Sequence, residues 1–158
     1  MNIARIFKLL VSLLLPIGLG SIAGIFTTEE IAVWYASLNK PSFNPPSHLF
    51  GPVWTALYIL MGVSMFLIWN TPKTKLRQKA LAVFGIQLFA NFWWSILFFN
   101  FHTVFLAVID ILIMWFLIIY MISLFKKIKP IAAYLQIPYL LWVSFATVLN
   151  ISIWYLNR

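Results

Sequence analysis

Three polar side chains recur at four-residue steps in an otherwise apolar stretch: Gln87, Asn91 and Ser95. Four-residue steps place side chains on one face of an α-helix. A polar group inside hydrocarbon costs free energy unless it finds a partner, so each is a candidate for function. Hydrogen bonding between helices is the favoured interpretation for Gln87 and Asn91. For Ser95, which Trp94 and Phe98 flank, contact with a ligand is an equal alternative.

Aromatic residues form similar patterns in two other apolar stretches. Trp54 and Tyr58 are four residues apart, and Trp142, Ala146 and Asn150 follow one another at the same step. The chain has 8 Trp in 158 residues, more than membrane–water interfaces alone require. This pattern suggests aromatic walls around a flat, apolar ligand, with packing of the protein core as the competing interpretation.

The chain offers few groups for acid–base or metal chemistry. Asp110 is the only acid within an apolar stretch. A hydrogen bond to Asn150 or Asn91 is its favoured interpretation, and a proton relay is the alternative. His48 and His102 have no second ligand at helical spacing, and the absence of cysteine excludes a thiolate nucleophile or thiolate metal site. We therefore expect neither a metal centre nor a hydrolase with a nucleophilic triad.

Membrane-spanning helices must position these side chains, because 63% of the chain is hydrophobic and only 9% is charged. About a quarter of a soluble chain is charged. Apolar runs long enough to cross the hydrocarbon core predict five spans. They are roughly residues 6–26, 49–69, 80–101, 104–125 and 131–156, with Pro138 expected to kink the last one. We expect an all-α membrane bundle that forms a single domain over residues 1–158.

The basic residues indicate how the bundle is oriented. With the N-terminus in the cytoplasm, nine of the 11 Lys and Arg lie on the cytoplasmic side, and only Lys40 and Arg158 lie outside. Cytoplasmic loops are enriched in Lys and Arg, so we expect the N-terminus inside and the C-terminus outside. The net charge of +8 is therefore interpreted as a topology signal and a contact with anionic lipids, rather than with nucleic acid.

The first span has an alternative interpretation as a cleavable signal peptide, because a basic start precedes an apolar run and the small residues Ser21 and Ala23. Retention is favoured. Gly20 and Gly24 form a small-xxx-small pair that lets helix backbones approach closely, and packing within one chain is the preferred role for this pair.

The connection between the first two spans, about residues 27–48, is aromatic and rich in proline. Pro41, Pro45 and Pro46 stiffen it, and its aromatics are too many for an ordinary solvated loop. We expect an ordered lid over the mouth of the bundle.

Residues 34–46 of this segment closely resemble the signature of the TspO/MBR family, the tryptophan-rich sensory proteins and translocator proteins, also called peripheral-type benzodiazepine receptors. The match continues in several blocks in the same order along the chain. They are Phe50-Gly51-Pro52-Val53-Trp54-Thr55-Ala56-Leu57-Tyr58, Leu60-Met61-Gly62, Gln87-Leu88 with Asn91, Trp94-Ser95, Phe98-Phe99, Pro138-Tyr139-Leu140-Leu141-Trp142 and Phe145-Ala146-Thr147 with Leu149-Asn150.

The resemblance implies a five-helix membrane bundle, usually a homodimer, with an aromatic pocket beneath the first loop. Family members bind porphyrins such as protoporphyrin IX, haem-related tetrapyrroles and isoquinoline or benzodiazepine-type ligands there, so a porphyrin is expected as ligand and no cofactor is expected. Carried over by position, the pocket involves Tyr35, Trp54, Tyr58, Asn91, Trp94, Ser95, Phe98, Trp142, Ala146 and Leu149. In bacterial relatives the residues that match Trp54 and Trp142 are tied to light-driven oxidative breakdown of protoporphyrin IX, and only such photochemistry would make these two residues catalytic.

A sterol-binding pattern of animal members is matched only loosely at the C-terminus. Leu149, Tyr155 and Arg158 fit it, but Ile151 and Ser152 depart from it. Tyr155 with Arg158 is better interpreted as an anchor at the membrane interface.

The leading functional hypothesis is a membrane receptor or sensor for tetrapyrroles. A light-dependent porphyrin-degrading enzyme is the alternative. A transporter of tetrapyrroles or lipids is least supported, because the halves of the chain show no internal repeat. The composition, rich in Ile, Phe, Lys and Asn, hints at a bacterial cytoplasmic membrane.

Overall fold

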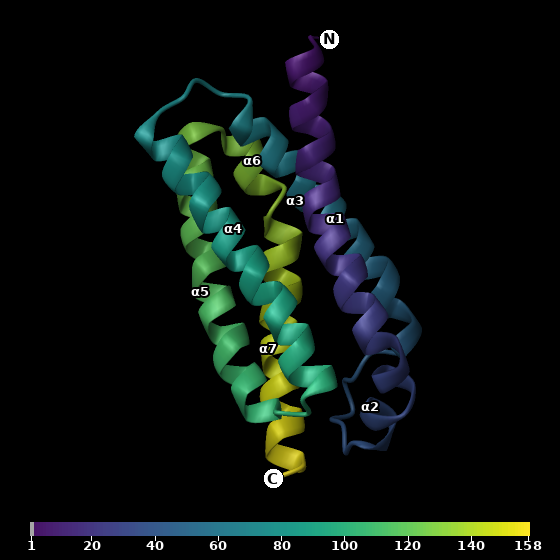
Figure 1. Ribbon diagram of the computed structural model, residues 1–158. Coiled ribbons are helices and arrows are strands. Elements are labelled where there is room, and N and C mark those ends of the chain that lie inside the picture. Colours follow the sequence, from purple (N-terminus) through teal and green to yellow (C-terminus); the bar gives the residue numbers. More distant parts are fainter. Residues whose placement is uncertain (1) are drawn as a thin grey trace.

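The computed structural model describes residues 2–158, and within that range the chain forms helices and no strand (Figure 1). Five helical rods are long and apolar enough to cross a membrane. The all-α membrane bundle predicted from the sequence is therefore confirmed. The elements are α1 (Ile3–Ala32), α2 (Trp34–Ser37), η1 (Ser47–Leu49), α3 (Phe50–Trp69), α4 (Lys75–Ser95), η2 (Ile96–Asn100), α5 (Val104–Ile128), α6 (Pro130–Tyr134) and α7 (Ile137–Leu156).

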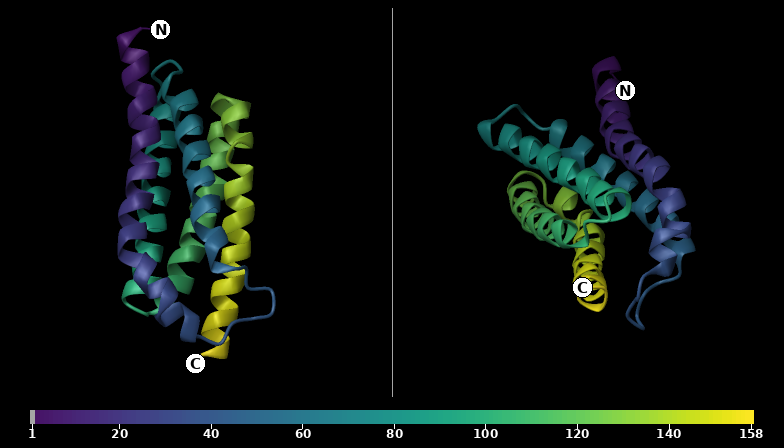
Figure 2. Two further views of the ribbon diagram at one scale, coloured as in Figure 1. Left: turned by 90° about the vertical axis from the view of Figure 1, so that its right-hand side faces the viewer. Right: turned by 60° about the horizontal axis from the view of Figure 1, so that its bottom comes forward.

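The rods lie side by side in an elongated bundle, with the two chain ends at opposite ends of it (Figures 1 and 2). α1 packs mainly on α3, α4 packs on α5, and α5 packs on α7. The side chains buried between α4, α5 and α7 include Phe84, Ile111, Met114 and Tyr139. Outward-facing Leu141 is 65% exposed, in keeping with a surface that meets lipid rather than water.

The close packing of α1 on α3 depends on two glycines. A Cβ atom at Gly20 would lie 2.1 Å from a ring carbon of Tyr58, and one at Gly62 would lie 2.7 Å from the backbone oxygen of Ser12. The packing role predicted for Gly20 is confirmed. For Gly24 it is wrong, because nothing lies within 4 Å of a Cβ atom there.

Several helix ends differ from the predicted boundaries. α1 continues to Ala32, so the connection predicted over residues 27–48 begins six residues later. The kink predicted at Pro138 is a break: α6 ends at Tyr134, and Pro138 is the second residue of α7. Proline is tolerated there because the N–H groups in the first turn of a helix have no intrahelical carbonyl partner, so a proline at this position loses no helix hydrogen bond.

The third rod ends in a wider turn. η2 is π-helical, and the N–H of Phe101 donates to the carbonyl of Ile96 over 3.0 Å. Short π-helical segments are rare and occur frequently at functional sites. This one turns Phe98 and Phe99 into the protein, where both are buried.

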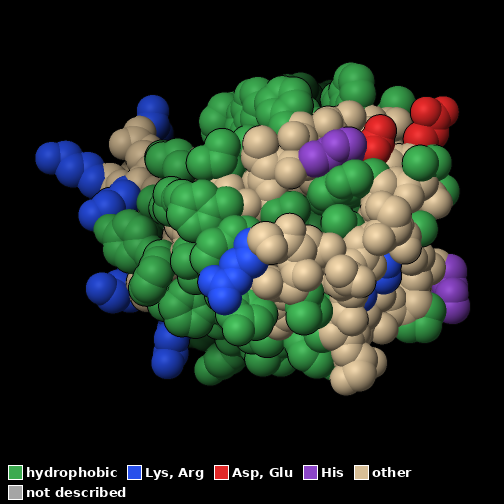
Figure 3. Space-filling model, turned by 90° about the horizontal axis from the view of Figure 1, so that it is seen from below, with side chains coloured by type: hydrophobic (Ala, Val, Ile, Leu, Met, Phe, Trp, Pro, Cys, Tyr) green, Lys and Arg blue, Asp and Glu red, His purple; other side chains and the backbone are tan. Residues whose placement is uncertain are grey.

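Most basic residues lie at the end of the bundle that carries the N-terminus. Lys8 and Arg77 both donate to the carbonyl of Trp69 at the end of α3, over 3.4 and 3.2 Å. The opposite end, seen in Figure 3, carries acidic side chains of α1 and the histidines, and His102 lies beside Glu30 there. The bundle is therefore strongly polarised in charge along its length.

Candidate ligand-binding site

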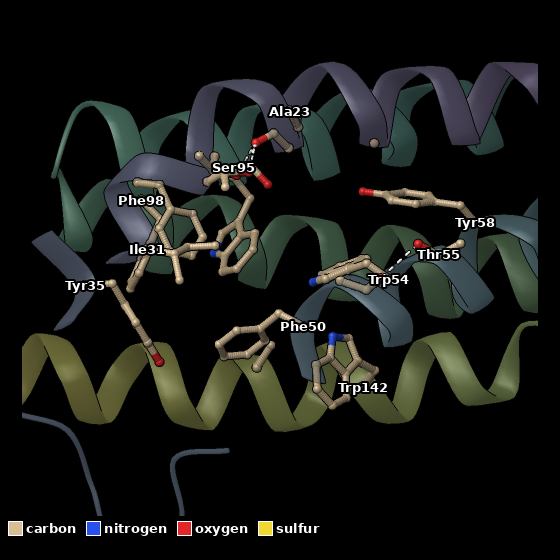
Figure 4. A pocket seen from close by; sticks show the side chains of 18 of the residues that line it. Ala23, Ile31, Tyr35, Phe50, Trp54, Thr55, Tyr58, Ser95, Phe98 and Trp142 are labelled. Carbon is tan, nitrogen blue, oxygen red and sulfur yellow. Dashed lines mark hydrogen bonds between the residues drawn. The ribbon is translucent and has the colours of Figure 1, made fainter. Parts of the chain in front are cut away.

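A cavity of about 340 Å³ lies between α1, α3, the junction of α4 with η2, and α7 (Figure 4). It occupies the half of the bundle that carries α2 and the C-terminus. Its volume falls within the range of small-molecule sites. It is lined by Ile17, Gly20, Ser21, Ala23, Gly24, Thr27, Thr28, Ile31, Tyr35, Phe50, Gly51, Trp54, Thr55, Tyr58, Trp94, Ser95, Phe98, Phe99, Trp142, Phe145, Ala146, Leu149, Asn150 and Ile153.

One wall is a ladder of four aromatic rings from α3, α4 and η2. Tyr58 stacks on Trp54 with ring centroids 5.6 Å apart, and Trp94 stacks on Phe98 at 5.7 Å. Trp54 and Trp94 join the two pairs at 6.3 Å. The four-residue steps in the sequence place each pair on one helical face, so the ladder follows directly from that spacing.

The opposite wall comes from α7 and the start of α3. Trp142 lies between Phe50 and Phe145, with ring centroids 6.4 and 5.6 Å away. Its indole Nε1 is buried and has no hydrogen-bond partner among the described residues. By contrast, Nε1 of Trp94 donates to Oδ1 of Asn150 over 2.9 Å. Within residues 2–158, the indole N–H of Trp142 is therefore an unpaired buried donor, which is costly for a folded protein.

α1 closes the third side with small residues. Gly20, Ala23, Gly24 and Thr27 line the cavity where α1 passes the ladder. Larger side chains at these positions would fill the space, so the room for a ligand is created by α1 as much as by the aromatic rings.

A chain of buried hydrogen bonds behind the ladder fixes the ring of Tyr58. Its hydroxyl donates to Oδ1 of Asn91 over 2.8 Å, and Nδ2 of Asn91 donates to the hydroxyl of Tyr139 over 3.1 Å. That hydroxyl donates in turn to Oε1 of Gln87 over 2.9 Å. The prediction of hydrogen bonding between helices for Gln87 and Asn91 is therefore confirmed.

Residues 33–49, which connect α1 to α3, are called the lid, and Tyr35 is the lid residue that lines the cavity. Tyr35 is buried, lines the cavity, and donates from its hydroxyl to Oδ1 of Asn44 over 2.5 Å. Burial raises the pKa of Tyr35 to about 12. The ammonium of Lys40 donates to the carbonyls of Tyr35, Ala36 and Leu38 over 2.7, 3.1 and 2.8 Å and so holds the end of α2.

The proline-rich part of the lid lies beside the bundle rather than over the cavity. Asn157, just after α7, exchanges two hydrogen bonds with the backbone of Asn39, over 3.0 and 2.9 Å. Phe43 contacts Phe145 with ring centroids 6.3 Å apart. None of the prolines predicted to form a roof lines the cavity, which is covered by Tyr35 and Phe50 instead.

The structure brings together nine of the ten residues that the sequence assigned to a pocket. Those that line the cavity are Tyr35, Trp54, Tyr58, Trp94, Ser95, Phe98, Trp142, Ala146 and Leu149. Asn91 differs from the expectation: it lies behind Tyr58, and its side chain is occupied by the hydrogen bonds to Tyr58 and Tyr139. Asn150 supplies an amide to the cavity lining in its place.

The contribution of α1 to the cavity was not predicted from the sequence. A usable signal was present, because Gly20, Gly24, Thr27 and Ile31 recur at steps of three and four residues and so share one helical face. That face carries no aromatic residue, and small residues are as typical of helix packing as of a ligand site.

The arrangement suits binding better than acid–base chemistry. No charged side chain belongs to the lining within residues 2–158, and no group of three potential metal ligands occurs in that range.

Asp110 does not pair with Asn150 or Asn91 as expected; its Oδ2 is buried without a hydrogen-bond partner among the described residues. At the C-terminus, the guanidinium of Arg158 lies 4.0 Å from the ring centroid of Tyr155, and the role of this pair as an interfacial anchor stays a prediction.

Comparison with known proteins identifies the family. Residues 12–156 match the sequence model of the TspO/MBR family. The chain is 37% identical to the tryptophan-rich protein TspO of Archaeoglobus fulgidus over 154 residues, which cover 97% of this chain and 99% of that protein. It is 36% identical to the translocator protein of Homo sapiens over 132 residues, or 82% of this chain and 78% of that protein. It is also 33% identical to the tryptophan-rich sensory protein of Cereibacter sphaeroides over 124 residues, which cover 78% and 77% of the two chains. This integral membrane protein therefore belongs to the TspO/MBR family.

Proposed function

We propose that the protein is a membrane receptor or sensor that binds porphyrins, protoporphyrin IX above all, in the aromatic cavity. The observation that carries this proposal is a cavity of about 340 Å³ between two aromatic walls, with no charged group in its described lining. A flat macrocycle gains dispersion contacts and apolar burial between such walls. The names of the relatives, translocator protein and tryptophan-rich sensory protein, are in keeping with such a role.

The lining residues have different parts in this proposal. Trp54 and Trp94 stack on the ligand from one side, while Trp142 contacts it from the other and donates a hydrogen bond from Nε1. The hydroxyl of Ser95 offers a second polar contact. Asn91 acts through Tyr58, whose ring it fixes, and does not touch the ligand. Isoquinoline or benzodiazepine-type ligands would occupy the same space.

Titration of protoporphyrin IX in detergent or nanodiscs tests the site, with the visible absorbance of the porphyrin as the readout. Trp142→Ala removes one wall, and Ala146→Trp fills the cavity without removing a polar group. Each change should weaken binding at least about tenfold, a loss of about 1.4 kcal/mol. Trp93→Ala is the matched control, because Trp93 is 37% exposed and does not line the cavity. Equal affinity of the cavity variants and the control would refute the site.

A photochemical enzyme is the second candidate, and one observation favours it: Trp54 and Trp142 both line the cavity. Illumination of the porphyrin complex in air should then yield a new absorbing product. Trp54→Phe and Trp142→Phe should abolish that product while the porphyrin stays bound. If the product formed equally fast in both variants, the reaction would be photobleaching of the free pigment and would not depend on the two tryptophans.

The proposal includes a bacterial cytoplasmic membrane as the location, with the N-terminus inside. The charge polarity of the bundle supports this orientation, because the basic loops 73–79 and 126–129 share the end that carries the N-terminus. Assembly as a homodimer stays a prediction from the family resemblance.

A further inference from the structure

The last turn of α1 and the start of α2 are fastened to the turn that follows η2. Nε2 of His102 lies 2.9 Å from Oε2 of Glu30. The imidazole also stacks on the indole of Trp34, with ring centroids 4.2 Å apart and only 12° between the planes. Glu30, Trp34 and His102 are called the latch below. A neighbouring hydrogen bond, from Nδ2 of Asn100 to the carbonyl of Phe26 over 3.0 Å, joins the same two segments.

The backbone of His102 is held in an uncommon conformation. Its φ of 54° makes it the only residue other than glycine with a positive φ among residues 2–158. A non-glycine residue persists in this region when surrounding contacts compensate for the strain, and such residues concentrate at functional sites. Here the conformation directs the imidazole toward Glu30 and Trp34 at once.

The latch lies directly behind one wall of the cavity. The ring of Trp34 meets that of Phe98 edge-on, with centroids 5.4 Å apart. Phe98 lines the cavity from η2, whereas Ile31 and Tyr35 line it from α1 and α2. This wall is continuous only while the end of α1 stays against η2, so the contacts of the latch also keep that side of the cavity closed.

We propose that the latch is a pH-sensitive gate of the cavity. Imidazole groups change charge between about pH 5 and 8. An imidazolium attracts both the carboxylate of Glu30 and the π face of Trp34, whereas the neutral ring keeps only a hydrogen bond and stacking. The gate is therefore held shut at low pH and opens more readily as pH rises.

The surroundings of His102 contain few groups that compete with this switch. Glu30 is its ion-pair partner on α1, and Trp34 on α2 carries no charge. η2 and the first turn of α5 contain no charged residue, and the first one on α5 is Asp110. Glu29, next to Glu30, makes no ion pair within the described residues and supplies a matched control.

Spin-label distances test the gate without any ligand. Because the chain has no cysteine, Val33→Cys and Phe101→Cys, at positions 73% and 60% exposed, give unique labelling sites on the two segments. In nanodiscs at about pH 5.5 we expect one short distance, with a longer population added at about pH 8. His102→Asn, which tolerates the same φ, and Glu30→Gln should show the longer population at both pH values. In the control variants His48→Asn and Glu29→Gln, the distances should change with pH as they do in the chain with the unaltered latch.

A distance distribution that does not change with pH in the otherwise unaltered chain would overturn the proposal, and so would a pH response that persists in His102→Asn.

A second experiment measures the dissociation of protoporphyrin IX and rests on the proposed binding of this ligand. Its dissociation should be about two- to fivefold slower at the lower pH, and His102→Asn should remove that difference. If the porphyrin does not bind at all, the proposed function fails while the spin-label distances still decide the latch. If the distances shift but the dissociation rate does not, the latch is not a gate.

Discussion

Gly20 sets the position of Tyr58 in the cavity wall, because nothing larger than hydrogen fits between α1 and the ring. In Gly20→Ala the new Cβ would lie 2.1 Å from a ring carbon, so the ring must shift and strain its hydrogen bond to Asn91. Overpacking of this kind costs about 1–3 kcal/mol of stability. We also expect porphyrin affinity to fall about tenfold or more. Thermal unfolding and porphyrin titration measure the two effects.

Gly18→Ala is the control for this change. A Cβ atom at Gly18 has open space around it, and Gly18 does not line the cavity. In a helix interior the exchange of glycine for alanine stabilises by up to about 1 kcal/mol. If the two variants unfolded and bound alike, Tyr58 would be free to move and the account of the α1 wall would be wrong.

At the scale of single residues, sequence spacing predicted the aromatic ladder but not which amide faces the cavity. Asn91 and Asn150 both stand in apolar stretches at four-residue steps from other candidates. Their roles differ because Tyr58 covers Asn91, while Trp94 bonds to Asn150 from the side and leaves it in the lining. That distinction depends on the rotation of α4 and α7 against their neighbours, which no one-dimensional pattern contains.

At the scale of the structural elements, the contribution of the lid to stability depends on the phenol of Tyr35 staying protonated. Its pKa is about 12 in the folded protein and about 10 in an unfolded chain. Between these values the folded state retains a proton that the unfolded state has lost, so stability falls as pH rises from about 10 to 12. Tyr35→Phe removes this dependence along with the hydrogen bond to Asn44. The absorbance of tyrosinate in the ultraviolet is compared between the two proteins, and the group that is missing from Tyr35→Phe should titrate near pH 12. A missing group that titrates near pH 10 would contradict the burial of Tyr35.

The lid is also tied to α7 by Asn157. In Asn157→Ala both hydrogen bonds to the backbone of Asn39 are lost, and we expect faster amide hydrogen exchange in residues 38–44 by about five- to tenfold, equivalent to about 1 kcal/mol. Ser152→Ala, which removes only a hydrogen bond within α7, serves as the control. Equal exchange in both variants would mean that the prolines alone order the lid.

Helix lengths were predicted less well than helix existence. The hydrophobic run of the first span ends at residue 26, but α1 continues to Ala32 and includes the polar residues from Thr27 to Glu30. Those turns are polar because they reach the end of the bundle, where Glu30 meets His102. Tertiary contacts with a distant turn extend the helix, and a hydropathy pattern does not register them.

For the molecule as a whole, the separation of charge predicts its orientation in the membrane. With no native cysteine, Lys73→Cys and Arg158→Cys report the two ends of the bundle separately. A membrane-impermeant maleimide added to intact cells should label Arg158→Cys at once. It should label Lys73→Cys only after permeabilisation. The reverse pattern would invert the proposed topology.

The central claim is that a porphyrin lies inside the bundle, between the ladder on α3 and α4 and the wall that Trp142 forms on α7. A crystal structure of the complex with protoporphyrin IX tests it most directly. The account predicts macrocycle density between Trp54, Trp94 and Trp142, with a porphyrin atom accepting a hydrogen bond from Nε1 of Trp142. Density on the lipid-facing surface or outside the lid, with the cavity empty, would contradict it.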